Sequence, residues 1–169
     1  MPIKTVYWDA NIFHALFGKE PGRVEFCERI EKAALDGDVD IYTSAITLVE
    51  CVWVKTIVDP TGKLNKLSPA HEEMLHKYFL RPYIRVVQCD RRMSEFARSL
   101  MWKYPALRPK DSIHVATAIF HGVDFMHSYD DDDLVKLSGL LGTPPLKICH
   151  PCDGDGFEPQ LKQIPLSGP

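Results

Sequence analysis

The sequence has no uninterrupted apolar run that approaches the about 20 residues needed by a bilayer-spanning helix. Its first residues also lack a basic segment followed by an apolar one, which is the pattern of a secretory signal. The five cysteines form an odd set, which argues against the disulfide framework of a small secreted protein. We therefore expect a soluble, cytoplasmic protein with no membrane partner.

The chain also has no excess of positive charge. Its 169 residues include 20 Lys and Arg against 23 Asp and Glu, which gives a net charge of −3. No overall basic field attracts nucleic acid, so any such binding must use local patches. The sequence also lacks a glycine-rich phosphate loop and a G-x-S-x-G motif, which argues against P-loop and α/β-hydrolase chemistry.

What the sequence does contain is an alternation of strand-like and helix-like segments, in a chain with the size and composition of one globular domain. Strands are expected at 3–8, 39–42, 84–87, 123–127 and 146–148, and helices at 12–17, 23–35, 45–57, 69–80, 94–102 and 111–121. This alternation predicts an α/β fold, a parallel sheet of about five strands flanked by helices. Proline and glycine dominate the end of the chain, so we expect one domain over residues 1–150 and an irregular tail over 151–169.

Four acidic residues lie where their apolar neighbours make them costly. Asp9 ends the first strand, and Asp130 follows the fourth. Glu50 falls on the apolar stripe of the helix expected at 45–57, and Asp111 opens the buried helix. Sites in open parallel sheets form beyond the carboxyl ends of the strands, so these carboxylates are expected to meet. Two of them about 4 Å apart repel by roughly 4 kcal/mol at an effective dielectric constant of 20, so a cation must offset their charge.

Each of these acids also has a purely structural interpretation. Asp9 and Asp111 could each cap the helix that follows, which stabilises a helix by about 1 kcal/mol. Glu50 could pair with an arginine, either Arg85 or Arg108. The run of four aspartates after the fourth strand could be a solvated turn. Only the joint pattern of the four acids favours a functional site.

Four blocks of sequence carry a family resemblance: YWDANIF at residues 7–13, TSAITLVE at 43–50, PKDSIHVATA at 109–118 and HSYD at 127–130. In order and spacing they resemble the signature blocks of PIN-domain nucleases, over about residues 3–150. The resemblance implies a three-layer PIN-like domain whose four acids form a metal-dependent ribonuclease site. The chain departs from the family at Ser128, where Thr is usual. The aspartate run blurs the fourth acid; Asp130, two residues after Ser128, is our choice, with Asp132 or Asp133 in reserve.

Oxygen ligands without thiolate or imidazole suit Mg²⁺ or Mn²⁺. We expect Asp9 and Asp111 to be the direct ligands of the cation. Glu50 and Asp130 are expected to act directly or through bound water. The proposed chemistry is hydrolysis of RNA phosphodiester bonds, which leaves a 5′-phosphate and a 3′-hydroxyl.

The cationic neighbours of the third acid are the expected contacts to substrate phosphate, namely Arg108 and Lys110. The resemblance further implies a toxin of a toxin–antitoxin pair, with a protein antitoxin as partner and a homodimer as the assembly. Two rival functions stay open at this point. One is a PIN-like module that binds RNA or protein without cleavage. The other is a haloacid-dehalogenase-like phosphatase, although that chemistry needs an acid two residues after the first aspartate, where this chain has Asn11.

Two weaker patterns have simpler structural explanations. Cys149, His150 and Cys152 have a zinc-like local spacing, but no second pair of ligands completes the set within the chain. His114 and His121 lie seven residues apart on one helical face. We expect both histidines to be packed or hydrogen-bonded in the core rather than catalytic.

Overall fold

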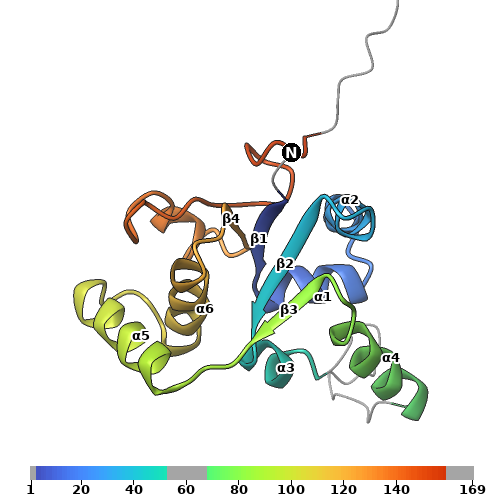
Figure 1. Cartoon of the computed structure of the whole chain (residues 1–169), viewed down its shortest axis with the longest axis horizontal. Helices are drawn as coiled ribbons and strands as arrows, with labels where there is room; N and C mark the ends of the chain where they lie inside the picture. Colours follow the sequence, from blue (N-terminus) through green and yellow to red (C-terminus); the bar gives the residue numbers. More distant parts are fainter. Residues whose placement is uncertain (1–2, 53–67, 159–169) are drawn as a thin grey trace, which may run out of the picture.

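The computed structural model describes residues 3–52 and 68–158, which form a five-stranded parallel sheet flanked by helices (Figure 1). The strands are β1 (Lys4–Trp8), β2 (Val39–Ser44), β3 (Ile84–Val87), β4 (Phe125–His127) and β5 (Ile148–Cys149). Their order across the sheet is β3-β2-β1-β4-β5, and every neighbouring pair is parallel. The chain therefore builds outward from β1 in one direction and then returns to the other side of β1 with β4. The reversal lies between β1 and β4, which is where ligand sites form in such sheets.

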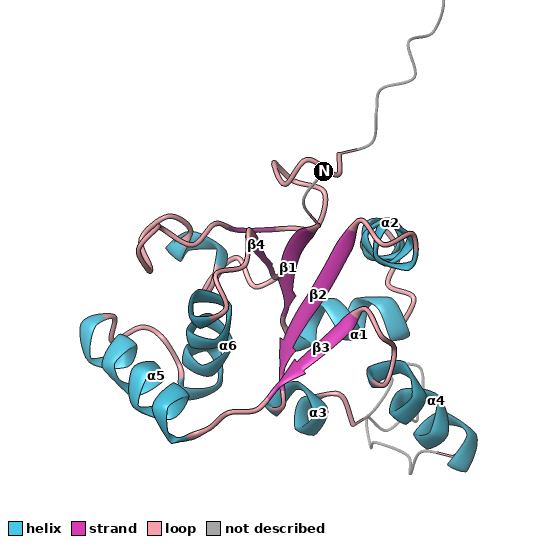
Figure 2. Ribbon diagram, viewed as in Figure 1, coloured by secondary structure: helices cyan, strands magenta, loops and turns pink. Residues whose placement is uncertain are grey.

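Helices cover both faces of the sheet, so the molecule has three layers (Figure 2). The helices are α1 (Ala10–Phe17), α2 (Val24–Leu35), α3 (Ile46–Glu50), α4 (Pro69–Phe79), α5 (Arg91–Lys103) and α6 (Pro109–Phe120), with a 3₁₀ turn η2 (Val135–Leu137). Successive strand residues face opposite sides, so Tyr7 packs in the core under α5 and α6, and Trp8 in the core under α1 and α2. This architecture confirms the predicted fold class. In the described part of the chain, none of the helices is long and apolar enough to cross a bilayer.

Two helices beside the expected site differ from the prediction. Helix α3 ends at Glu50, and residues 53–57 of the helix expected at 45–57 lie outside the described residues. Val49 is 72% exposed. The prediction that this apolar stripe faces the core, with Glu50 inside it, is therefore wrong. Helix α6 begins at Pro109, two residues before Asp111, because proline fits the first position of a helix. Asp111 is therefore not the cap of its helix, although it lies in the first turn.

Residues 150–158 follow β5 as turns, and they fold back onto the sheet. Asp155 and Cys152 are both buried. The Asp155 carboxylate accepts the backbone N–H groups of Cys152 and Phe157, and its Oδ2 lies 2.8 Å from Nε2 of His127 on β4. The beginning of the segment expected as an irregular tail is thus attached to the core at residues 151–158.

Candidate active site

A cavity of about 510 Å³ lies where β1 and β4 end. Figure 1 shows helix α3 just beyond the ends of β2 and β3, on the same edge of the sheet. The cavity is lined by residues from four separate segments: Asp9, Ala10, Asn11, Glu50, Arg108, Pro109, Lys110, Asp111, His114 and Asp130. The fold thus brings together all four acids and both cationic residues that the sequence singled out.

Asp9 is the most buried of the four acids, with 2% of its surface exposed. Its Oδ1 accepts the backbone N–H of Ile12 at 3.2 Å, so it caps helix α1. Its Oδ2 accepts the hydroxyl of Ser128 at 2.5 Å. Burial raises the pKa of Asp9 to about 6, although these hydrogen bonds and the nearby His114 oppose the rise. The capping interpretation is therefore correct for Asp9, and it does not exclude a second role.

Ser128 connects Asp9 to Asp130. Its hydroxyl donates to Asp9 and accepts the backbone N–H of Asp130 at 3.0 Å. Asp130 Oδ1 in turn accepts the backbone N–H of Asp133 at 2.9 Å, which closes a turn after β4. The Ser128 hydroxyl thus holds the two acids Asp9 and Asp130 in a fixed relation to each other.

Two of the acids that line the cavity, Asp111 and Asp130, lie beside a third carboxylate, that of Asp133. Asp111, Asp130 and Asp133 each offer one oxygen, and these oxygens lie within 4.8 Å of one another. The pKa of Asp111 is raised, first by burial and then by the negative charges of Asp130 and Asp133, while His114 and Arg108 oppose the rise. The structure thus adds the reserve residue Asp133 to the group beside Asp130, whereas Asp132 is exposed.

Glu50 reaches the cavity from the end of α3 and has no arginine partner among the described residues. Its Oε1 accepts Lys110 Nζ at 2.8 Å, and its Oε2 lies 2.8 Å from Nε2 of His114. The two suggested arginines pair elsewhere, Arg85 with Asp40 and Arg108 with Asp133. Burial alone would raise the pKa of Glu50, but the hydrogen bonds from His114 and Lys110 hold it at about 2.

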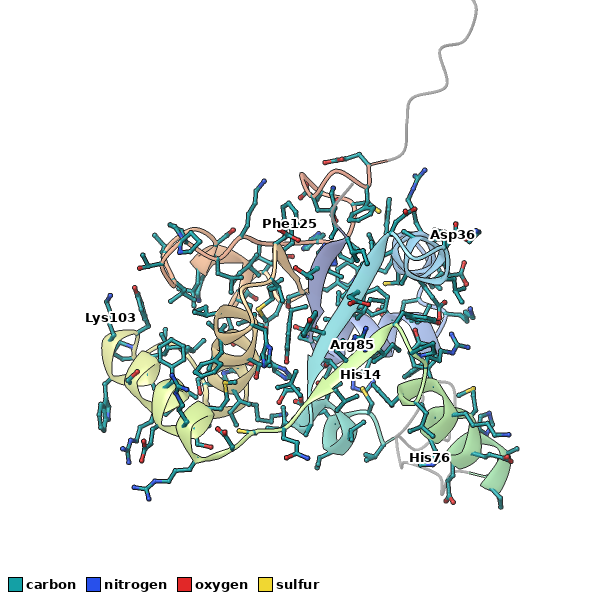
Figure 3. All side chains as sticks on the ribbon, viewed as in Figure 1. His14, Asp36, His76, Arg85, Lys103 and Phe125 are labelled. Carbon is teal, nitrogen blue, oxygen red and sulfur yellow. The ribbon has the colours of Figure 1, made fainter. Side chains whose placement is uncertain are left out.

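The cations at the rim of the cavity are largely exposed. The side chain of Arg108 is 73% exposed, and its Nη2 lies 3.0 Å from Asp133 Oδ2. The side chain of Lys110 is 64% exposed. Figure 3 shows two other basic residues away from this edge, Arg85 on β3 and Lys103 at the outer end of α5. Arg108 and Lys110 are the arginine and lysine side chains among the residues that line the cavity.

The PIN domain profile matches residues 6–140 of the chain. The chain belongs to the PIN domain family. VapC20 of Mycobacterium tuberculosis, a sarcin–ricin loop cleaving toxin, has a TM-score of 0.56 with this PIN domain at 15% identity, over 75% of this chain and 91% of that one. A Rickettsia felis VapBC2 structure, bound to a fragment of promoter DNA, has a TM-score of 0.58 at 13% identity, over 86% of this chain and 98% of that one. A toxin–antitoxin complex from Klebsiella pneumoniae has a TM-score of 0.54 at 18% identity, over 86% and 97% of the two chains.

At these identities the structural likeness is evidence for the fold. A search of curated proteins found no match. Family membership and fold agree with the resemblance that the sequence blocks predict. The roles of individual residues rest on the geometry of this chain.

His114 lines the cavity of the PIN domain, although the sequence analysis did not predict it as a site residue. It is 2% exposed and lines the cavity between Glu50 and the sheet. A signal was available, because His114 follows Asp111 by three residues and such pairs share a helix face. The expectation of a hydrogen-bonded, buried histidine is correct for His114. It is wrong for His121, which is exposed beside Tyr42.

The oxygen ligands of the cavity fit a hard divalent cation. Asp111, Asp130 and Asp133 present carboxylate oxygens without competing thiolates, as Mg²⁺ and Mn²⁺ prefer. Burial raises the pKa of both Asp9 and Asp111, and a bound cation would oppose that rise by favouring the ionised carboxylates. Both oxygens of Asp9 accept a hydrogen bond, and each keeps a second lone pair that a cation could use.

A second group of metal-ligating types lies elsewhere in the PIN domain, at His127, Cys149 and Asp155. It fits a metal poorly. The indole N–H of Trp8, which can only donate, lies 3.1 Å from His127 Nδ1, so the ring proton is on Nε2 and faces Asp155. A metal-bound histidine instead donates from its other nitrogen. Burial lowers the pKa of His127, which favours this neutral, hydrogen-bonded ring.

Proposed function

We propose that this PIN domain protein is a Mg²⁺- or Mn²⁺-dependent endoribonuclease. The observation that carries the proposal is the convergence of Asp9, Glu50, Asp111 and Asp130 from separate segments on one cavity. Asp133 adds a fifth carboxylate. Such a concentration of like charge is costly, and a divalent cation with a phosphodiester substrate accounts for it.

The roles of the residues follow from their places in the cavity. Asp111, Asp130 and Asp133 would hold the cation, with Asp9 and Glu50 completing its surroundings directly or through water. When bound, such a cation lowers the pKa of a water molecule and neutralises charge that develops on the phosphate. Arg108 and Lys110 would contact the phosphates on either side of the cut.

The rival functions fit the cavity less well. A haloacid-dehalogenase-like phosphatase needs a general acid at the position that Asn11 occupies in this cavity. An asparagine side chain cannot serve as that acid. A module that only binds RNA or protein has no use for several carboxylates around the place where phosphate must lie. Both alternatives are therefore weaker than hydrolysis.

The biological setting is proposed from the neighbours. The Klebsiella pneumoniae structure is a toxin–antitoxin complex, and VapC20 is a sarcin–ricin loop cleaving toxin. We infer that this chain is likewise a toxin that cleaves RNA, that a protein antitoxin inhibits it and that it forms a homodimer in the cytoplasm. Light scattering on the purified protein tests the dimer, and co-purification with the product of an adjacent gene tests the antitoxin.

The nuclease proposal is tested by cleavage of a mixed panel of structured RNAs and single-stranded DNA. Wild type and Asp9→Asn are compared in Mn²⁺, in Mg²⁺ and in chelator. We expect RNA cleavage that needs the metal and that Asp9→Asn abolishes while the protein stays folded. Equal cleavage by both proteins, or cleavage that survives the chelator, would overturn the proposal. Two inert but folded proteins that bind the RNAs would favour the binding module.

A further inference from the structure

A chain of buried hydrogen bonds connects the backbone of β2 to the carboxylate of Glu50. The backbone N–H of Ser44 donates to the hydroxyl of Tyr7 at 3.0 Å. The Tyr7 hydroxyl lies 2.6 Å from Nδ1 of His114, and Nε2 of the same ring lies 2.8 Å from Glu50 Oε2. Tyr7 is fully buried and His114 nearly so. None of these contacts is needed to form a helix or a strand.

The direction of each bond follows from the groups at the two ends. An ionised carboxylate only accepts, so the ring nitrogen that faces Glu50 carries a proton. When the ring is neutral, its lone pair is then on Nδ1, which accepts the O–H of Tyr7. The free lone pair of that hydroxyl accepts the N–H of Ser44. The Ser44 amide can only donate, so it takes up an acceptor position of the Tyr7 hydroxyl and leaves the Tyr7 proton for His114.

We infer that Tyr7 and His114 are positioning residues that orient the Glu50 carboxylate towards the cavity. This inference rests on the proposed function, in which Glu50 takes part in holding a divalent cation. The two partners of Glu50 differ in burial, because the side chain of Lys110 is 64% exposed and that of His114 only 3%. The rigid ring of His114 anchors Oε2 on the buried side. Oε1 is left to face Lys110 and the cavity.

The geometry favours positioning over mere core packing. Tyr7 stands two residues before Asp9 on β1, so the same strand fixes Asp9 directly and Glu50 through His114. His114 stands one helical turn after Asp111 on α6. The ring therefore connects the carboxylate at the end of the short helix α3 to β1 and α6. Hydrogen bonds behind metal ligands typically change metal affinity or activity 10- to 100-fold.

The test is the affinity for Mn²⁺, measured by calorimetric titration into folded protein. Tyr7→Phe keeps the ring and removes only the hydroxyl, and we expect it to weaken Mn²⁺ binding about 10- to 100-fold. His114→Leu should weaken binding to the same extent. His114→Gln, which retains a donor near the position of Nε2, should restore most of the affinity. Tyr78→Phe is the matched control, because this buried tyrosine lies on α4, away from the cavity, and its affinity should equal that of wild type.

The outcomes separate this inference from the proposed function. If wild type binds Mn²⁺ and Tyr7→Phe binds it within twofold of wild type, the positioning role is wrong and the nuclease proposal stands. Equal losses in His114→Leu and His114→Gln would also overturn it. If wild type binds no Mn²⁺, the proposed function fails and takes the inference with it. Should Tyr7→Phe not fold, the two His114 variants decide the question.

Discussion

Asp9 is a carboxylate held in the protein interior by two hydrogen bonds that do not repay the full cost of burial. Its pKa of about 6 lies above the ordinary value of 3.8, so the folded protein binds the Asp9 proton more tightly than the unfolded chain does. The contribution of Asp9 to the free energy of unfolding therefore grows as the pH falls from about 6 to 3.8, and it is lost as the pH rises through 6.

The first prediction concerns Asp9→Asn in the presence of chelator. Asparagine caps helices as well as aspartate does, and it carries no charge. At pH 8 we expect the free energy of unfolding to rise by up to about 3 kcal/mol, since one unit of pKa corresponds to about 1.4 kcal/mol. Urea denaturation at pH 8 and pH 5 measures it, and the advantage should shrink at pH 5. An advantage that grows towards acid pH would contradict the assignment.

The aspartate run offers a comparison between neighbours. Asp130 and Asp133 face Asp111, whereas Asp132 is exposed to solvent. Wild type should gain thermal stability with Mn²⁺, because a ligand at 100 times its Kd adds about 2.7 kcal/mol. Asp130→Asn and Asp133→Asn should lose most of this gain, and Asp132→Asn should keep it. The same gain in all three variants would show that the aspartate run does not bind the cation.

At the scale of elements, the strands and the order of the acids can be read from the sequence, because parallel strands buried on both faces give short apolar runs. The extent of α3 cannot be read in this way. Its apolar residues follow a helical spacing, but Val49 points outward. Periodicity shows which residues share a face and does not show what covers that face. Asp133 joins the site through the turn that follows β4, and His114 through its position one turn after Asp111 on α6. Sequence spacing alone does not show which of the neighbouring residues reach the site.

The C-terminal turn gives an element-scale prediction. Asp155 satisfies the buried N–H groups of Cys152 and Phe157 and faces His127. Burial alone would raise its pKa, but these partners hold it below the ordinary value. Asp155→Ala leaves the N–H groups of Cys152 and Phe157 without their acceptor and should lower the free energy of unfolding by about 2–4 kcal/mol. The control is Asp153→Ala in the same turn, whose side chain is exposed. Urea midpoints that match for the two variants would show that the turn is not anchored by Asp155.

At the scale of the whole molecule, a net charge of −3 makes RNA binding depend on a few local cations. Arg108→Gln and Lys110→Gln should each weaken RNA binding and lower the slope of affinity against salt by about 0.7. Lys77→Gln is the control, because Lys77 pairs with Glu73 on α4 and does not line the cavity. Fluorescence anisotropy in an Asp9→Asn background avoids cleavage. If the slope of affinity against salt is unchanged in both cavity variants, Arg108 and Lys110 do not bind RNA phosphate.

The measurement that tests the account most directly is the chemistry of the new ends in an RNA cut by wild type. If carboxylates and a divalent cation direct water onto the phosphorus, the bond to the 3′-oxygen breaks and the products carry a 5′-phosphate and a 3′-hydroxyl. Ligation-based sequencing with and without prior phosphatase or kinase treatment reads both ends. We predict 5′-phosphate ends that appear only with Mn²⁺ or Mg²⁺. Cyclic 2′,3′-phosphate ends would mean attack by the ribose hydroxyl, and would contradict the function proposed for these acids.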